Sequence, residues 1–240
     1  MSASDSTDRT HRTAHPPAAS TAASTGADPA ADRHMSVEEV AESYAGVADD
    51  VAARDWVDRL FAGRLRRRQF GDVDGRVLDV ACGTGTNFRY LPPTVDLVGI
   101  DASPAMLAHA RETLDGLGRD GELHEMDAAS LAFPDDGFDA VVSAFSTCTF
   151  PDPIAALREM ARVCRPDGRI LLLEHGLSDV SPVAWLQEWR AEAHYESLGC
   201  RLDQEPLELV REAGLSVVDA DEALLGVVTS IEADPARPSG

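Results

Sequence analysis

Residues 76–101, RVLDVACGTGTNFRYLPPTVDLVGID, constrain the fold more than any other part of the chain. An apolar run typical of a strand leads into a turn that contains Gly83 and Gly85. A short helical stretch follows, and a second apolar run ends at Asp101. In such a strand–helix–strand unit the glycines let a ligand approach the backbone, and the acidic residue accepts hydrogen bonds from ribose hydroxyls. We therefore expect a cofactor that contains adenosine.

The turn also narrows the choice of cofactor. The dinucleotide fingerprint requires a third glycine, and Phe88 occupies its position. The chain contains no lysine, which excludes the phosphate-binding lysine of a P-loop. S-adenosylmethionine, which has an adenosine, a sulfonium cation and no phosphate, fits better. A nicotinamide-dependent oxidoreductase and a non-catalytic S-adenosylmethionine-binding protein are the alternatives.

Strand-like and helical patterns alternate along most of the chain. This alternation predicts an α/β fold, a Rossmann-like doubly wound and mostly parallel seven-stranded sheet in one domain over residues 35–230. The last two apolar runs predict an antiparallel hairpin at one edge of the sheet. Residues 1–34 have almost no large apolar side chain and are predicted to be a disordered tail, and residues 231–240 a flexible one.

Two helical patterns precede the glycine turn. Ser36 and Glu39 have the spacing of a capping box, which predicts the start of a helix. A second helix is predicted over residues 53–70, with the basic cluster 64–68 on its exposed face. Ser103, followed by a proline, is predicted to be the N-cap of the helix after Asp101.

The chain is strongly acidic, with a formal net charge of −21. All 21 basic residues are arginines, a composition that resembles proteins of salt-loving archaea or high-GC bacteria. Direct nucleic-acid binding is disfavoured because phosphate contacts need a basic face. No apolar run approaches the length of about twenty residues that a membrane span needs, so we predict a cytoplasmic protein without an integral membrane segment. The sequence does not define an oligomeric state.

The four cysteines lack the paired spacing of a metal site. They are Cys82, Cys148, Cys164 and Cys200. We expect small buried side chains in a reducing compartment and no bound metal.

Four segments resemble successive motifs of class I S-adenosylmethionine-dependent methyltransferases of the ubiquinone/menaquinone type. They read VLDVACGTGTN, VGIDASPAML, HEMDAASLAFPDDGFDAVVSAFS and LREMARVCRPDGRILLLEHG, and the resemblance covers about residues 36–230. CGTGTNF, LLLEH and the later GCRL also resemble methyltransferase-like thiol methyltransferases, and bacterial phosphatidylethanolamine N-methyltransferases share much of the pattern. The animal thiol enzymes carry an N-terminal membrane anchor, whereas this chain has a polar segment there. The resemblance implies a small-molecule acceptor: a thiol, a quinone-type ring, or a lipid or amine head group.

The resemblance also implies roles for particular residues. Asp79, Gly83 and Gly85 are expected to shape the methionine side of the cofactor site. Asp101 is expected to bind the ribose, and Ala102, Asp127 and Ala128 to surround the adenine. Ser143 is expected to line the methyl-transfer pocket, and Tyr44 to lie over the cofactor. For Asp101 the alternative is a helix cap, for Asp127 a solvated loop carboxylate, and for Tyr44 a core position.

His175 is the ionisable group that most suggests catalysis. It follows the fifth predicted strand, and ligands of open α/β sheets bind beyond the carboxyl ends of the strands. Its imidazole is a candidate base that takes a proton from a thiol, phenol or enol, and a hydrogen bond to a loop is the alternative. Glu174 is expected to hold a neighbouring backbone segment or a substrate amine.

Overall fold

The computed structural model of the chain describes residues 35–235. The predicted disorder of residues 1–34 and the part of the predicted C-terminal tail from residue 236 onward lie outside the described residues.

A seven-stranded sheet organises the described part of the chain, in the order β3-β2-β1-β4-β5-β7-β6. The strands are β1 (Arg76–Val80), β2 (Asp96–Asp101), β3 (Glu122–Glu125), β4 (Phe138–Ala144), β5 (Cys164–His175), β6 (Ser216–Ala223) and β7 (Val228–Asp234). Strands β1 to β5 are parallel to one another, and β7 runs antiparallel to its neighbours β5 and β6. The predicted fold class and its C-terminal hairpin are confirmed.

The C-terminal boundary of the domain differs from the prediction. Strand β7 continues to Asp234, and the side chains of Ile231 and Ala233 are fully buried. Residues 231–234 therefore belong to the sheet and not to a flexible tail. Their alternation of buried and partly exposed side chains is that of a strand with one face on the core.

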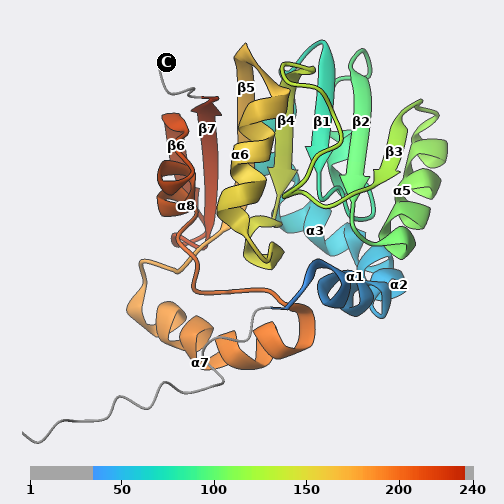
Figure 1. The fold of residues 1–240 in the computed structure, drawn as a ribbon. Coiled ribbons are helices and arrows are strands. Elements are labelled where there is room, and N and C mark those ends of the chain that lie inside the picture. The colour runs from blue at the N-terminus through green and yellow to red at the C-terminus, as the bar shows by residue number, and fades with distance from the viewer. Residues whose placement is uncertain (1–34, 236–240) are drawn as a thin grey trace, which may run out of the picture. The chain divides into compact units, whose positions relative to one another are not determined.

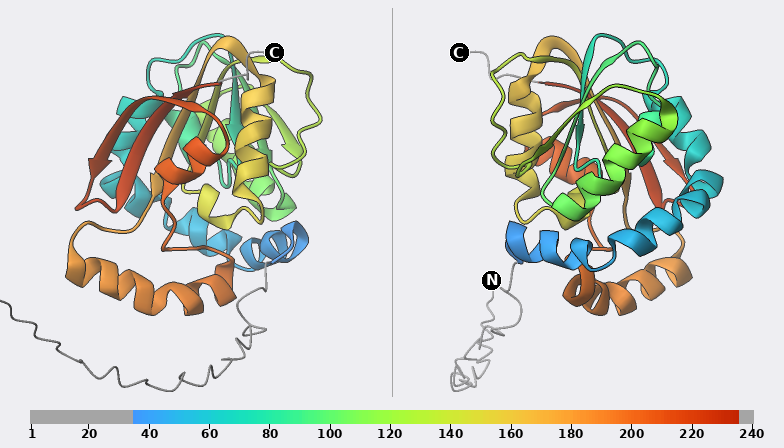
Figure 2. Two further views of the ribbon diagram at one scale, coloured as in Figure 1. Left: turned by 60° about the vertical axis from the view of Figure 1, so that its left-hand side comes forward. Right: turned by 90° about the vertical axis from the view of Figure 1, so that its right-hand side faces the viewer.

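Helices cover both faces of the sheet and also lie beyond the carboxyl ends of its parallel strands (Figures 1 and 2). They are α1 (Val37–Ala45), α2 (Ala48–Ala53), α3 (Asp55–Phe61), α4 (Gly63–Phe70), α5 (Pro104–Leu117), α6 (Pro153–Val163), α7 (Ser181–Leu198) and α8 (Pro206–Glu212). Two short 3₁₀ turns, η1 (Thr86–Arg89) and η2 (Thr147–Thr149), follow β1 and β4. The capping box of Ser36 and Glu39 at the start of α1 is confirmed.

The single helix predicted over residues 53–70 is wrong, because the helical backbone is interrupted there. Helices α2, α3 and α4 are separate, with breaks at Arg54 and Ala62. Gly63 at the second break has no room for a side chain, because an added Cβ would lie 2.8 Å from the hydroxyl of Tyr90. Nor is the whole basic cluster exposed, since Arg66 is buried.

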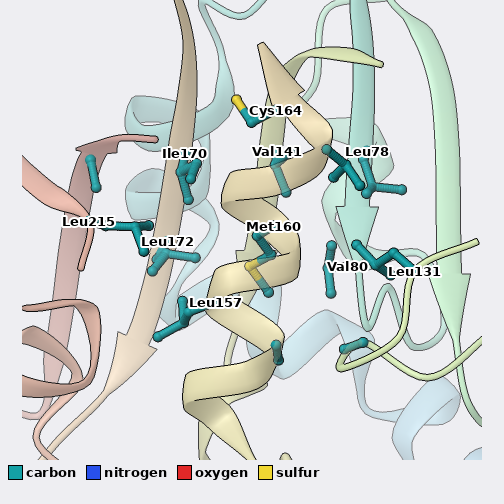
Figure 3. Close-up of a cluster of buried hydrophobic side chains, with 14 of the residues drawn as sticks. Leu78, Val80, Leu131, Val141, Leu157, Met160, Cys164, Ile170, Leu172 and Leu215 are labelled. Atoms are coloured by element: carbon teal, nitrogen blue, oxygen red, sulfur yellow. The ribbon is translucent and has the colours of Figure 1, made fainter. Parts of the chain in front are cut away.

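Two apolar clusters pack the helices against opposite faces of the sheet. On one face, Leu157 and Met160 of α6 lie against Leu78, Val141 and other strand residues (Figure 3). On the other face, α4, α5 and η1 pack over alternate residues of the same strands. Strand β1 is buried on both sides, as expected at the centre of a parallel sheet.

Helices α1 and α7 lie beyond the carboxyl ends of the parallel strands (Figure 1). Helix α7 has no buried residue, and it exposes the rings of Trp185 and Trp189, which stack on one another. Within residues 35–235 none of the helices combines the length and apolar character needed to cross a membrane.

Replacement of Leu157 by alanine tests the packing of α6. Its side chain is fully buried, so the substitution should lower the free energy of unfolding by about 2–5 kcal/mol through lost burial and the resulting cavity. Leu60→Ala, on α3 and 71% exposed, is the matched control and should change it by less than about 0.5 kcal/mol. Denaturant unfolding measures both, and equal effects would contradict the assigned packing.

Candidate active site

A cavity opens beyond the carboxyl ends of β1, β2 and β4 and is closed on one side by α1. It brings together six of the residues singled out from the sequence: Tyr44, Gly83, Asp101, Ala102, Asp127 and Ala128. These residues come from α1, from the last position of β2, and from the segments that follow β1, β2 and β3. The cavity therefore lies where ligands of doubly wound sheets bind.

The turn after β1 leaves open space beside its first glycine. Gly83 has a φ of +56°, and an added Cβ would meet no atom within 4 Å. Its backbone N–H donates to Asp101 Oδ2 at 2.9 Å, which joins the ends of β1 and β2. A ligand can thus come close to the backbone at Gly83, as the sequence predicts.

The carboxylate of Asp101 is held in place by two backbone donors. Besides Gly83, the N–H of Ser103 donates to Oδ1 at 2.9 Å. Burial raises the pKa of Asp101, and the hydrogen bonds from Ser103 and Gly83 oppose that shift. Each carboxylate oxygen still has a lone pair that can accept a ligand hydroxyl.

Ser103 occupies the predicted N-cap position of α5, with Pro104 next to it, but its side chain does not cap the helix. Its hydroxyl makes no hydrogen bond to the described residues, and no side-chain cap bond forms at the start of α5. The Asp101 carboxylate instead accepts a hydrogen bond from the Ser103 N–H. Asp101 therefore both holds the N-cap residue of α5 and lines the cavity.

Asp79 lies fully buried beneath the cavity rather than in its lining. Its Oδ1 accepts a 2.9 Å hydrogen bond from the Asn87 side chain, whereas Oδ2 has no partner among the described residues. Arg66 hydrogen-bonds Asn87 Oδ1 and forms two 3.0 Å bonds to Asp58. Burial raises the pKa of Asp79 to about 7, against the lowering effects of Asn87 and Arg66.

Gly85 and Ser143 are placed differently from what the resemblance implies. Gly85 is not in the cavity lining, and an added Cβ would lie 2.5 Å from the ring of Phe88. The Ser143 hydroxyl is buried behind the cavity, where it donates to Val80 O at 2.8 Å and hydrogen-bonds Ser146. It is Ser146 that lines the cavity.

Glu174 shapes the loop between β4 and η2. Its buried carboxylate accepts hydrogen bonds from the backbone N–H of Ser146 at 2.9 Å and of Thr147 at 3.2 Å. The expectation that it holds a backbone segment is confirmed. The same loop contains Phe145, whose φ of +54° is unusual for a residue with a side chain and marks a strained segment beside the cavity.

Tyr44 lines the cavity and is close enough to Cys148 and Cys200 to feel their charges. Burial raises the pKa of its hydroxyl, and the charges of Cys148, Cys200 and Asp101 add to that rise. Its helix, α1, is connected to α7 because the backbone N–H of Met35 donates to the hydroxyl of Tyr195 at 2.9 Å.

His175 is not in the cavity lining. Its Nε2 lies 3.3 Å from Cys200 Sγ, which in turn lies 3.2 Å from Cys148 Sγ. All four cysteines are buried, as predicted. The sequence shows no paired spacing of metal ligands, yet these three side chains, which could bind a metal ion, come together in space from distant segments.

Several residues of the lining were missed from the sequence. Thr84, Thr86 and Asn87 belong to the same glycine turn, and their polarity within an apolar region was the available signal. Met106 and Met126 supply apolar walls but are indistinguishable from core residues in a sequence.

The fold and the cavity define a nucleoside-binding protein of the doubly wound class.

The profile of the methyltransferase domain family matches residues 78–172. Phosphatidylethanolamine N-methyltransferase of Cereibacter sphaeroides is 38% identical over 160 residues, covering 64% of this chain and 78% of that protein. Demethylmenaquinone methyltransferase of Thermus thermophilus is 43% identical over 137 residues, covering 52% and 62%. The match thus spans less than two thirds of the Thermus protein.

Solved structures share the fold at low sequence identity. A methyltransferase of Aquifex aeolicus has a TM-score of 0.59 and 19% identity, covering 79% of this chain and 98% of that one. The cyclase SpnF has a TM-score of 0.65 and 20% identity, covering 83% and 97%. Together with the sequence relatives, this places the chain in the S-adenosylmethionine-dependent methyltransferase family.

S-adenosylmethionine is the cofactor of this family, and the site fits it. The unpartnered Oδ2 of Asp79 suits the positively charged amino acid end of that molecule. The open space at Gly83 leaves room against the backbone, and the fixed carboxylate of Asp101 is an acceptor for ribose hydroxyls.

The buried carboxyl of Asp79 should make stability depend on pH. Its pKa is about 7 in the folded protein against 3.8 as the reference, so the unfolded chain releases the proton first. The stabilisation is complete below about pH 4 and is lost as the pH rises to about 7, by at most ~1.4 kcal/mol per pH unit. Asp79→Asn keeps an acceptor for Asn87 and should remove this dependence. Denaturation at several pH values measures it, and parallel profiles of the two proteins would contradict the assignment.

The two turn glycines should respond differently to alanine. Both have a positive φ, which costs about 1–2 kcal/mol for a residue with a side chain. Gly85→Ala should lose roughly 1–3 kcal/mol more, because its methyl group overlaps the buried Phe88 ring. Gly83→Ala should fold with the smaller loss but bind S-adenosylmethionine more weakly. Thermal unfolding and titration calorimetry separate the two effects, and the reverse pattern would refute the assigned roles.

Proposed function

We propose that the chain transfers the sulfonium methyl group to an apolar small-molecule acceptor that enters beside Tyr44, Phe145 and Phe150. The single observation that carries the proposal is the convergence of the Gly83 opening, the Asp101 carboxylate and the aromatic wall on one cavity. The first two serve the cofactor, and the aromatic side chains leave an apolar space for a second molecule.

The roles of the chain are binding, alignment and exclusion of water. S-adenosylmethionine supplies a methyl group on a sulfonium that is already a good leaving group. Gly83 borders the amino acid end, with the Asp79 carboxyl buried beneath it. Asp101 holds the ribose, and Asp127 with Ala128 the adenine. Helix α1 covers the cavity with Tyr44, which keeps water from the line of transfer. Positioning of two reactants in this way can contribute ~7–11 kcal/mol to lowering the barrier.

The acceptor class follows from relatives and from the sequence. A lipid amine and a quinone ring are the acceptors that the names of the relatives indicate, and a thiol is implied by the resemblance to thiol methyltransferases. A base is needed only for an acceptor that is protonated at the working pH. The sequence suggests His175 as that base, but its Nε2 lies 3.3 Å from Cys200 Sγ and the residue does not line the cavity, so the structure gives that role no support.

A non-catalytic cofactor-binding protein is the second candidate. The cyclase SpnF has the same fold, so the fold alone does not establish methyl transfer. Incubation with S-adenosylmethionine labelled in the methyl group and a set of lipid amines, quinone precursors and thiols distinguishes the two. Label in one acceptor class supports the proposal, whereas tight cofactor binding without any transfer supports the alternative.

Asp101→Asn tests the ribose contact. Hydrogen bonds to a charged group are worth about 1.5–3 kcal/mol, so the affinity for S-adenosylmethionine should fall about 10- to 100-fold. The amide still accepts one backbone hydrogen bond, so the fold should persist. Asp120→Asn, at an exposed position away from the cavity, is the control. Titration calorimetry measures both, and wild-type affinity in Asp101→Asn would exclude the assigned role.

A further inference from the structure

Three side chains that are typical metal ligands converge behind the cavity. Cys148 lies in η2, His175 ends β5, and Cys200 follows α7. Cys200 Sγ is 3.2 Å from Cys148 Sγ and 3.3 Å from His175 Nε2, and all three ligand atoms lie within 4.8 Å of one another. Both cysteines are buried. Nothing in the proposed cofactor site uses these groups.

The backbone around the three side chains is held by its own hydrogen bonds. The N–H of Arg201 donates to Cys148 O at 3.0 Å, and the Arg201 guanidinium donates to Phe150 O at 3.0 Å. Glu174, the neighbour of His175, binds the N–H groups that precede Cys148. The ligand atoms are therefore positioned by three separate segments before any ion binds, which lowers the ordering cost of binding.

The spacing of the ligand atoms is close to that of a zinc site. With Zn–S bonds of about 2.3 Å and Zn–N bonds of about 2.0 Å, a tetrahedral ion separates its ligand atoms by roughly 3.5–3.8 Å. The Cys200–Cys148 and Cys200–His175 distances, 3.2 and 3.3 Å, are shorter than these by a few tenths of an ångström. A small outward movement of the side chains would admit the ion.

We propose that Cys148, His175 and Cys200 bind one thiophilic divalent cation, Zn²⁺ by preference, through two thiolates and Nε2. Three protein ligands leave a fourth position open, which is the arrangement of catalytic zinc sites and not of closed structural ones. Two thiolates and an imidazole favour zinc over the hard cations Mg²⁺ and Ca²⁺, which prefer oxygen ligands.

Without an ion, the two thiols differ: the shared hydrogen bond and burial raise the pKa of the Cys148 thiol, so ligation through both sulfur atoms requires the cation to displace its proton. Hydrogen bonds with Cys148, and then with His175, lower the pKa of the Cys200 thiol against the effect of burial. The thiolate is the form of cysteine that binds metals. The charges of both cysteines act on the hydroxyl of Tyr44, which also lines the cavity, so the site lies next to the space proposed for the acceptor. A soft donor atom of an acceptor can take the fourth position.

Titration of the full chain with Co²⁺ tests the site. The protein is reduced, freed of metal with a chelator, and titrated anaerobically. One equivalent should give the strong visible bands of tetrahedral Co²⁺ and thiolate-to-cobalt charge transfer, and Zn²⁺ should abolish both. Cys148→Ser, Cys200→Ser and His175→Gln should each weaken binding at least tenfold, since even loss of an outer partner costs 10–100-fold.

Cys164→Ser is the matched control, because Cys164 is buried but lies outside the cluster. It should keep wild-type Co²⁺ affinity. The proposal is overturned by a wild-type protein that shows no charge-transfer band, or by unchanged affinity in both cysteine variants of the cluster. Binding of S-adenosylmethionine is measured on the same samples, so loss of the metal site and failure of the methyltransferase proposal give different results.

Discussion

A chain of buried hydrogen bonds runs from Asp58 through Arg66 and Asn87 to Asp79, and the cavity depends on it. It connects the N-terminal helices, the turn after β1 and the central strand. The arginine must be buried for the chain to form, and removing one partner would leave an uncompensated charge in the interior. Within the described residues, Asp79 Oδ2 remains without a hydrogen-bond partner, so the network ends at this atom beneath the cavity.

A second buried carboxylate, that of Glu174 at the end of β5, also holds a loop beside the cavity. Glu174 accepts backbone hydrogen bonds from the segment after β4, as Asp101 does from the segments after β1 and β2. Acidic side chains at strand ends thus fix the loops that surround the cavity. The acidity of this chain has two components: a solvated surface and a few carboxylates that organise the site.

The sequence predicts what is encoded locally. Gly83 and Asp101 were found because a strand, a turn and a second strand have a recognisable order, and the hairpin was found because its two runs are contiguous. Ser143 and His175 were placed correctly at strand ends, but a strand-end position does not say which way a side chain points. Arg66 and the cluster of Cys148, His175 and Cys200 depend on contacts between distant segments. Charge and spacing alone could not reveal such contacts.

The positions of the tryptophans determine what optical measurements can report. All three indoles lie on helices outside the sheet, at Trp56 of α3 and at Trp185 and Trp189 of α7, and each is more than half exposed. Indole emission responds to the polarity around the ring. The intrinsic tryptophan fluorescence of this protein therefore reports changes around α3 and α7 and hardly any change within the sheet. Detachment of α7 would alter emission while far-ultraviolet circular dichroism kept its strand signal.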